Sequence, residues 1–279
     1  MGVCNSTDKI MVARAALHMW EEPCISGKCG SGAVFFSGCS LGCCFCQNKA
    51  ISGGKAGKSI SIERLCDIFF ELAAKGAHNI NLVTPDHYVP QIICAIDMAK
   101  KRGFYLPFVY NCSGYETPRL VQMLDGYIDI YLPDFKYMSA DISERYSKAK
   151  NYSYFAKQAI NEMVRQCGGE KTTFDDEGMM KKGVIVRHLA LPTHTEDSRA
   201  IISYLYNTYK DDIFLSIMNQ YTPMPGIDKL YPELNRKVSE QEYEELVDYA
   251  VALGVENGFI QEGDTADESF IPEFFCEGV

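Results

Sequence analysis

The chain has 279 residues, of which 47% are hydrophobic, and its formal net charge is −10 at pH 7. This length suits one main α/β domain with small extensions and a sizeable core. The negative charge offers no basic surface to nucleic acid or to an anionic membrane, so neither partner is expected. No apolar run approaches about 18 residues and no signal segment is recognisable. We therefore expect a cytoplasmic protein whose twelve cysteines are reduced.

Residues 7–20 are predicted to form a helix, because apolar side chains recur there at spacings of three and four and Ser6 can cap the first turn. The run Glu21-Glu22-Pro23 ends this pattern, and a glycine-rich loop with Cys24 and Cys29 follows. Two thiols are too few to hold a second cluster by themselves. Packing within the loop is the simpler expectation for both.

Four cysteines lie within eight residues, directly after the apolar run 33–36. Three of them, Cys39, Cys43 and Cys46, have the spacing C-x3-C-x2-C. This set is one thiolate short of a closed zinc site or a fully ligated cubane cluster. Three thiolates can hold three corners of a [4Fe–4S] cube and leave the fourth iron open to a small molecule.

With Phe45 just before its last cysteine, this loop resembles the signature of the radical S-adenosylmethionine (SAM) enzymes. In that superfamily the open iron is chelated by the amino and carboxylate groups of SAM. One electron from the reduced cluster then breaks a C–S bond and gives a 5′-deoxyadenosyl radical. The resemblance implies that Cys39, Cys43 and Cys46 are the metal ligands.

Two other interpretations of the cysteines stay open. A zinc knuckle would need a fourth ligand from Cys24, Cys29 or a histidine, although zinc modules are small and this loop opens a long α/β chain. The alternative register is Cys39-x4-Cys44-x-Cys46. Because a C-x-C pair is poorly spaced for two corners of one cluster, we expect Cys44 to be a small packed residue.

Strand and helix patterns alternate after the cysteines, which is typical of a parallel sheet wrapped by helices. Six strand–helix units favour a partial (β/α)6 barrel of the radical SAM type, and an open doubly wound sheet is the alternative that periodicity cannot separate. Residues 168–182 are predicted to be a surface excursion. The predicted strands are 33–36, 78–83, 106–110, 128–132, 183–187 and 213–217, and the predicted helices are 62–75, 89–102, 118–124, 152–167 and 196–209.

We expect three parts in the chain. Residues 1–30 would form an N-terminal helix and a glycine-rich lead-in, residues 31–222 the core barrel, and residues 223–279 a C-terminal extension packed on the core. The extension starts with a proline-rich loop and contains a helix over 240–253 with Ser239 as its N-cap.

Polar side chains follow every predicted strand, and in parallel barrels the site forms from these loops. SAM needs acceptors for its ammonium and ribose hydroxyls, and a cationic or amide donor for its carboxylate. Arg187, His188 and Tyr221 are the candidate catalytic residues facing the substrate, with a hydrogen-bonded structural histidine as the alternative for His188. The predicted cofactor contacts are Phe45, Asn48, Thr84, Asn111, Ser113, Glu116, Asp134 and Lys136.

Further motifs resemble a narrower family, the radical SAM homologues of pyruvate formate-lyase activating enzyme. The resemblance covers almost the whole chain and implies a cluster, SAM and a partial barrel closed by the C-terminal segment. Its motifs are Ile25–Gly32, Phe35–Cys39, Asn81–Pro85, Tyr110–Glu116, Leu132–Lys136, Val186–Pro192, Met218–Pro223, Asn235–Lys237, Glu256–Gln261 and Glu268–Pro272.

Two details of that resemblance concern the cofactor. Asp134-x-Lys136 is similar to an element of true activases in which the acidic residue helps to hold a monovalent cation near the SAM carboxylate. Activases usually carry Gly-Gly-Glu after the second strand, where this chain has Thr84-Pro85-Asp86. Thr84 or backbone carbonyls would then have to bind the SAM amine.

The implied function is hydrogen abstraction by a 5′-deoxyadenosyl radical, an oxidoreductase chemistry. Activation of a glycyl radical protein is favoured slightly over modification of a peptide or small metabolite. The implied partners are a reductant such as flavodoxin or ferredoxin and a protein or peptide substrate. The alternative from another class is a non-catalytic iron–sulfur or zinc protein that binds metal without cleaving SAM.

Overall fold

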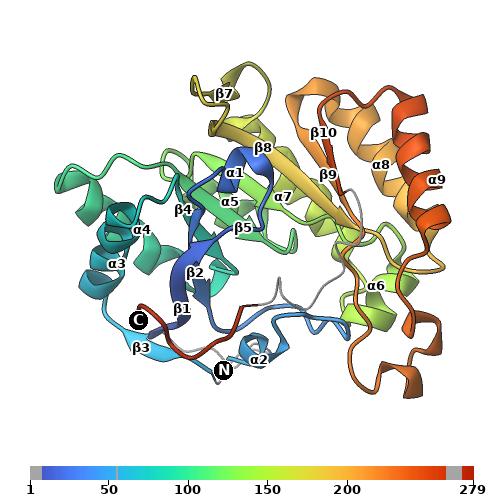
Figure 1. Cartoon of the computed structure of the whole chain (residues 1–279), viewed down its shortest axis with the longest axis horizontal. Helices are drawn as coiled ribbons and strands as arrows, with labels where there is room; N and C mark the ends of the chain where they lie inside the picture. Colours follow the sequence, from blue (N-terminus) through green and yellow to red (C-terminus); the bar gives the residue numbers. More distant parts are fainter. Residues whose placement is uncertain (1–7, 55, 262–271) are drawn as a thin grey trace.

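The computed structural model describes residues 8–54, 56–261 and 272–279. Within these ranges the chain forms a ten-stranded sheet in the order β10-β9-β8-β6-β5-β4-β2-β1-β3, with β7 paired to β8 beside this path. The sheet is open, with β3 and β10 at its two edges (Figure 1). The strands are β1 (Ile10–His18), β2 (Ser31–Phe36), β3 (Lys58–Ile60), β4 (Ile80–Val83), β5 (Phe108–Cys112), β6 (Ile130–Pro133), β7 (Thr173–Phe174), β8 (Met180–Leu189), β9 (Phe214–Met218) and β10 (Gly258–Ile260).

The parallel part of the sheet runs from β2 through β4, β5, β6, β8 and β9 to β10. Its first six strands are those predicted from the sequence, which confirms the α/β class and the open partial barrel. Strands β2, β4, β5 and β6 are buried at every position. Strands covered on both faces are continuous apolar runs in the sequence, and this explains why they were easy to locate.

Helices flank the sheet, with α3 and α4 at one side of the view and α8 and α9 at the other (Figure 1). Ser61 caps α3 by accepting a hydrogen bond from the Arg64 N–H, and Ser239 and Glu242 form a capping box on α9. The helix α6 was not predicted. The helices are α1 (Pro23–Ser26), α2 (Lys49–Ser52), α3 (Ile62–Ala74), α4 (Val89–Lys101), α5 (Pro118–Met123), α6 (Ala140–Ser147), α7 (Tyr152–Cys167), α8 (Thr195–Tyr209) and α9 (Glu240–Leu253).

The predicted helix over residues 7–20 is wrong, because this segment forms strand β1. β1 pairs antiparallel with β2 and β3, and its register shifts at a bulge between Val12 and Arg14. The bulge buries Val12 and Ala13 and then Ala15 and Ala16, while Arg14 is only half-buried. Two adjacent buried pairs three residues apart imitate the spacing of an amphipathic helix. The predicted N-cap, Ser6, lies outside the described residues.

Both predicted extensions contribute strands to the core sheet. β1 comes from the lead-in, and β10 from the C-terminal part pairs parallel with β9. Near the chain end, the Cys276 N–H donates to the Ala13 carbonyl at 3.0 Å and the Glu277 carbonyl accepts from the Ala15 N–H at 2.8 Å. The described end of the chain therefore satisfies the backbone at the bulged part of β1. Most of the Glu268–Pro272 motif falls outside the described residues.

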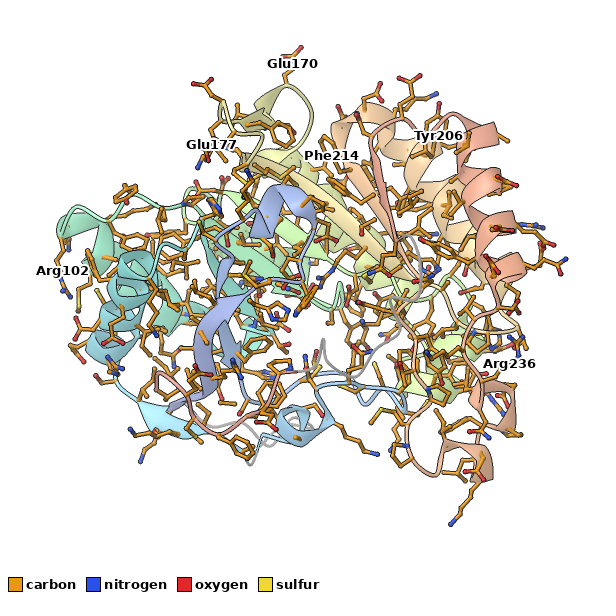
Figure 2. All side chains as sticks on the ribbon, viewed as in Figure 1. Arg102, Glu170, Glu177, Tyr206, Phe214 and Arg236 are labelled. Carbon is orange, nitrogen blue, oxygen red and sulfur yellow. The ribbon has the colours of Figure 1, made fainter. Side chains whose placement is uncertain are left out.

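Residues 168–182, predicted as a surface excursion, contain β7 and the beginning of β8, which pair antiparallel. Glu170 and Glu177 lie in this segment and project outward at its tip (Figure 2). Arg102 and Arg236 also point away from the core in this view, so these labelled charges are on the periphery. Among the described residues, no helix is both long and apolar enough to cross a bilayer.

Gly114 fixes the approach of two strand ends and gives the first testable prediction. Its φ is +78°, and a Cβ there would meet the Asp134 carbonyl oxygen at 2.0 Å. Gly114→Ala should lower the free energy of unfolding by about 3 kcal/mol or more, because left-handed strain and a backbone clash combine. Urea unfolding followed by circular dichroism measures this loss.

The matched control is Gly126→Ala. Gly126 has a φ of +80°, and a Cβ there would meet nothing within 4 Å among the described atoms. Gly126→Ala should therefore lower the free energy of unfolding by only about 1 kcal/mol, from backbone strain alone. Equal losses in the two variants would show that the close approach of the Gly114 and Asp134 backbones is not a constraint.

Candidate functional site

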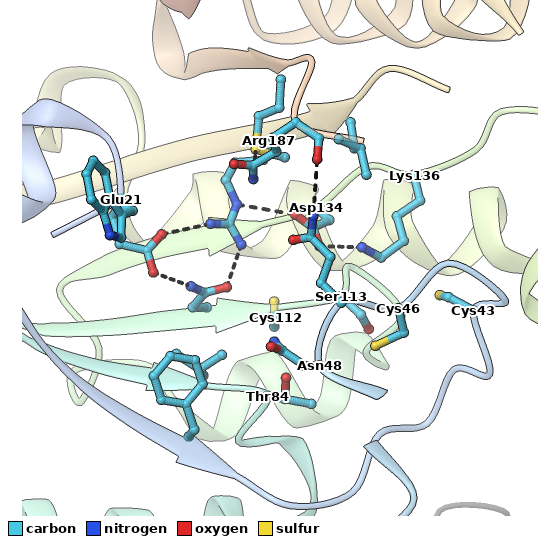
Figure 3. Close-up of a pocket in the computed structure, with 18 of the residues that line it drawn as sticks. Glu21, Cys43, Cys46, Asn48, Thr84, Cys112, Ser113, Asp134, Lys136 and Arg187 are labelled. Carbon is cyan, nitrogen blue, oxygen red and sulfur yellow. Dashed lines mark hydrogen bonds and ion pairs between the residues drawn. The ribbon is translucent and has the colours of Figure 1, made fainter. Parts of the chain in front are cut away.

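A cavity of about 360 Å³ is lined by residues from the strands of the sheet and from the loops that follow them. Cys39, Cys43 and Cys46 are among these residues. This volume lies in the range of ligand pockets, about 300–1,000 Å³. The cysteine loop follows β2, so it stands at the carboxyl ends of the parallel strands, where sites of such folds form. Cys43 and Cys46 lie at one side of the pocket (Figure 3).

The three thiols are held in a largely desolvated setting. The Ser147 hydroxyl donates to Cys43 Sγ at 2.9 Å, and the Leu41 N–H donates to Cys39 Sγ at 3.4 Å. Burial raises the pKa of the Cys39 and Cys46 thiols. Iron would therefore have to displace protons when it binds, as metals do at cysteine sites.

The arrangement of the thiols bears on which metal group fits. Cys39, Cys43 and Cys46 come from one short loop and line one cavity. A closed structural zinc site takes four ligands, whereas three thiolates can hold a cubane cluster with one iron left open. The three loop thiols therefore fit such a cluster.

The remaining cysteines near the loop lie elsewhere. The Cys44 N–H donates to the Tyr146 carbonyl at 2.8 Å, and its side chain packs against the core. Cys24 is buried in a separate apolar cluster with Val109, and Cys29 is exposed. Among the described residues that line the cavity, Cys24, Cys29 and Cys44 do not occur. This placement favours the Cys39, Cys43, Cys46 register.

Most of the predicted cofactor contacts meet in the cavity. They come from the cysteine loop and from the ends of β4, β5 and β6, and they are Phe45, Asn48, Thr84, Asn111, Ser113, Asp134 and Lys136. Thr84 has a φ of +55°, a left-handed conformation that costs a threonine about 1–3 kcal/mol. Glycine would adopt this conformation without strain, so Thr84 is a strained residue in the cavity wall.

Arg187 organises the middle of the cavity (Figure 3). Its guanidinium donates to Glu21 Oε2 at 2.9 Å, to Asn111 Oδ1 at 2.6 Å and to Asp134 Oδ1 at 3.2 Å. Glu21 Oε1 in turn accepts from the side-chain amides of Asn81 and Asn111, at 2.8 and 3.2 Å. One buried side chain of β8 thus joins groups from β4, β5, β6 and the segment after β1.

The electrostatics of this network are those of paired buried charges. Burial alone would lower the pKa of Arg187, but the carboxylates of Asp134 and Glu21 raise it. Burial would raise the pKa of Asp134, but Lys136 and Arg187 lower it. Asp134 Oδ2 pairs with the Lys136 ammonium and Oδ1 with Arg187. With both oxygens engaged by cations, Asp134 is poorly placed to hold a monovalent cation.

Three predicted site residues do not reach the cavity. The ring nitrogens of His188 are both engaged, at 2.8 Å from the Phe135 carbonyl and 2.8 Å from the Ser198 hydroxyl. The Tyr221 hydroxyl donates to the Leu234 carbonyl at 2.7 Å. His188 and Tyr221 are fully buried and are absent from the described cavity lining. We therefore withdraw both as substrate-facing candidates, and Arg187 remains.

Glu116 is the third residue, and it lies behind the cavity wall. Its Oε1 accepts from the Ser113 hydroxyl at 3.1 Å, and the Tyr110 hydroxyl donates to Asp86 Oδ1 at 2.7 Å. Asp86 Oδ2 and Glu116 Oε2 are both buried without a donor among the described residues, yet the two carboxyl groups interact. One proton shared between these oxygens satisfies both. Glu116 therefore acts through Ser113 and does not contact a ligand directly.

Several cavity residues were missed by the sequence analysis. The segment after β1 contributes Trp20, Glu21, Glu22 and Pro23 to the lining, and Gln47 and Gln220 face it as well. Because the sequence pattern predicts a helix that ends at Glu21-Glu22, it gives no indication that the residues after β1 line a cavity. The one available signal was a pair of carboxylates directly before a proline and a glycine-rich loop.

Comparison with known proteins identifies the family. The sequence pattern of the Radical SAM superfamily matches residues 33–205. The chain therefore belongs to the radical SAM superfamily, whose members use a [4Fe–4S] cluster and SAM. It is also 30% identical over 240 residues to the uncharacterized protein MJ0674 of Methanocaldococcus jannaschii, a match that covers 84% of this chain and 65% of that protein.

Solved structures show the same fold at low identity. SuiB of Streptococcus suis bound to S-adenosylmethionine has a TM-score of 0.54 at 12% identity, over 82% of this chain and 49% of that one. HydG, a maturase of the [FeFe]-hydrogenase, has a TM-score of 0.55 at 15% identity, over 84% of this chain and 52% of that one. The chain thus spans about half the length of these proteins. The likeness supports the partial barrel and leaves the substrate open.

The buried carboxyl pair gives a pH-dependent prediction. Burial and then the neighbouring Asp86 raise the pKa of Glu116 to about 8, against an unfolded value of about 4.3. The native state thus holds this proton more tightly, so the stabilisation is complete below about pH 4 and is lost as the pH rises toward 8. The loss approaches about 1.4 kcal/mol per pH unit for one proton.

Glu116→Gln cannot ionise and should show a much flatter decline in stability between pH 5 and pH 8. Chemical unfolding at several pH values measures the two slopes. Glu63→Gln, at an exposed position on α3, should keep the slope of the unchanged protein. Equal slopes of stability against pH in the unchanged protein and in Glu116→Gln would contradict the shared proton.

Proposed function

We propose that the chain is a radical SAM enzyme in which Cys39, Cys43 and Cys46 hold a [4Fe–4S] cluster with one iron open to SAM. When bound, the cluster supplies the electron for reductive cleavage of SAM to a 5′-deoxyadenosyl radical, which abstracts hydrogen from the substrate. The observation that carries this proposal is that these three cysteines line one cavity together with the polar strand ends. Cys44, in the same loop, is not among the described residues that line it.

The cavity side chains match the groups of SAM. Lys136 offers a cationic donor for the carboxylate, and its ammonium is held in place by Asp134. The Ser113 hydroxyl donates its proton to Glu116 and its oxygen accepts from the Tyr115 N–H at 3.3 Å, which leaves one further acceptor position for a ribose hydroxyl or the SAM ammonium. Thr84 and Asn48, which both line the cavity, supply a further hydroxyl and an amide.

Phe45 has a shielding role in this proposal. It is buried, lines the cavity and packs edge-on against Tyr137 and Tyr221, with centroid distances of 6.4 and 5.9 Å. An aromatic wall beside the thiols would exclude water and oxygen from a reduced cluster. The protein would thus orient the cofactor and protect it, while the cofactor supplies the chemistry.

For the substrate we favour a polypeptide, with activation of a glycyl radical protein as the first hypothesis. It is supported by motifs along almost the whole chain that resemble homologues of pyruvate formate-lyase activating enzyme. Modification of a peptide is the second hypothesis, supported by the likeness to SuiB bound to precursor peptide SuiA, with a TM-score of 0.54 at 12% identity, over 82% of this chain and 47% of that one. Either reaction would draw its electron from a reductant such as flavodoxin or ferredoxin.

Single cysteine variants test the proposed ligands. Under anaerobic reconstitution with iron and sulfide, Cys39→Ala, Cys43→Ala and Cys46→Ala should each lose stable four-iron loading. Each should also form at least about 100-fold less 5′-deoxyadenosine with dithionite and SAM, because a lost ligand removes the cluster that cleaves SAM. Iron and sulfide analysis and chromatographic quantification of 5′-deoxyadenosine provide the readouts.

Cys44→Ala is the matched control from the same loop and should keep both iron content and activity. Loss of iron in Cys44→Ala with retention in Cys43→Ala would move the ligand set to the alternative register. A well-formed cluster in the unchanged chain that yields no 5′-deoxyadenosine would favour an electron carrier. Preferential loading with zinc would contradict the proposal.

A further inference from the structure

The cavity extends well beyond the cysteine end. β1 runs antiparallel to β2, and His18 pairs with Ser31 at the start of β2, whereas the cysteine loop follows Phe36 at its end. At about 3.3 Å per residue, the segment after His18 stands roughly 16 Å along the strand from that loop. Residues 20–23 nevertheless line the same cavity. We call this region, residues 20–23 with Ser216 and Phe259, the inner end.

The inner end and the cysteines are separated by the Arg187 network. In the close-up, Glu21 lies on one side of Arg187, while Cys43 and Cys46 lie on the other (Figure 3). Lys136, the side chain suited to the SAM carboxylate, is on the cysteine side. SAM bound at the cysteines would therefore leave the inner end available to a second molecule.

Glu22 is the unusual group at the inner end. The residue is 8% exposed, and its carboxyl interacts with the Ser216 hydroxyl of β9. Its Oε2 is buried and has no hydrogen-bond partner among the described residues. The pKa of Glu22 is raised overall, because the effect of burial exceeds the opposing effect of Arg187. Buried carboxylate oxygens in native proteins nearly always have a donor, so a donor from a ligand is the natural explanation in a cavity-lining residue.

The charges around the cavity point to a cation. Glu21, Glu22 and Asp134 face two basic side chains, Arg187 and Lys136, which leaves one excess negative charge among the described lining residues. Arg187 is already hydrogen-bonded to Glu21, Asn111 and Asp134. His18 also lines this end, and burial lowers its pKa, so it stays neutral near pH 7. Arg187 acts on Glu22 electrostatically, but among the described residues its ion-pair contacts are to Glu21 and Asp134.

The walls near Glu22 are apolar and aromatic. Trp20, Pro23, Phe35 and Phe259 line the cavity there. A hydrocarbon stem would be buried favourably against these side chains, at roughly 25 cal/mol per Å² of apolar surface. The Glu22 carboxylate beside these apolar walls is suited to a cation at the end of a flexible hydrocarbon chain.

We propose that the inner end is the substrate-binding site and that Glu22 binds a primary ammonium carried on an apolar stem. The inference rests on the proposed function, since it assigns the cysteine end to SAM. A lysine side chain of a polypeptide and a free alkylamine both present this chemistry. Glu22 accepts an N–H of the ammonium, Ser216 holds the carboxylate in position, and Trp20 and Phe259 contact the stem.

Trp20 allows binding to be measured without SAM cleavage. It is the only tryptophan in the sequence, lines the cavity and is 57% exposed. The full chain, reconstituted anaerobically, is titrated with n-pentylamine, with the capped lysine N-acetyl-lysine methylamide and with n-pentanol while Trp20 emission is recorded. We expect saturable changes with an ammonium probe and none with the neutral alcohol. A response to the capped lysine alone assigns the site to a polypeptide, and a response to pentylamine alone assigns it to a free amine.

Two variants separate the role of Glu22 from general effects. Glu22→Gln should weaken ammonium binding at least about tenfold and raise the melting temperature of the ligand-free protein, because it removes an unpaired buried charge. Glu63→Gln, at an exposed position, should change neither quantity. If Glu22→Gln does not fold, Glu22→Asp, which withdraws the carboxylate by one methylene group, should weaken binding in the same direction.

Equal binding of pentylamine and pentanol, or unchanged ammonium affinity in both Glu22 variants, would overturn this inference. Failure of the two proposals can be told apart. Formation of 5′-deoxyadenosine without ammonium binding overturns only the substrate site. Ammonium binding without SAM cleavage overturns only the proposed enzyme class.

Discussion

The ion-pair network of Arg187, whose side chain is 14% exposed, is the interaction on which the rest of the structure depends. A charge in this position is tolerated only with well-placed partners, and loss of one partner of such a pair typically costs about 3–5 kcal/mol. Here the partners come from the segment after β1, from β5 and from the end of β6. Arg187 therefore fixes how the two halves of an open sheet face each other across the cavity.

The same network joins the fold to the proposed chemistry. Asp134 is shared between Arg187 and Lys136, so the ammonium suited to the SAM carboxylate is positioned by the residue that helps to hold the sheet together. Glu21 holds the other side of Arg187 and brings the neighbouring Glu22 into the cavity. A change at Arg187 would thus disturb both the cysteine end and the inner end.

The elements that the sequence predicted well are those with one dominant physical signal. Doubly covered parallel strands are continuous apolar runs, and helices such as α9 begin at a capping box. The spacing of Cys39, Cys43 and Cys46 pointed to one site, and the structure places all three on one cavity. These features are local, so neighbouring residues are sufficient to reveal them.

What could not be predicted depends on contacts between distant parts of the chain. The bulge in β1 gave a strand the periodicity of a helix, and the carboxylates after it were hidden with it. Tyr221 follows β9 and His188 lies near the end of β8, but their polar atoms are hydrogen-bonded within the protein, Tyr221 to the Leu234 carbonyl and His188 to the Phe135 carbonyl and the Ser198 hydroxyl. Whether such a residue reaches the cavity depends on the direction in which its side chain points. Its position along the strand does not determine that direction.

Radical SAM folds support many reactions, so the substrate must be argued from the groups that would face it. In this chain we propose that those groups belong to the inner end, on the Glu21 side of Arg187 (Figure 3). Substrate selection would then depend on residues after β1, outside the segment that matches the superfamily.

The central claim is that three thiolates leave one iron open to SAM. Electron paramagnetic resonance of the reconstituted, dithionite-reduced chain, recorded before and after SAM is added, tests it most directly. We predict a reduced [4Fe–4S] signal that shifts when SAM binds at the open iron. A signal of a fully formed cluster that stays unchanged at saturating SAM would contradict the claim.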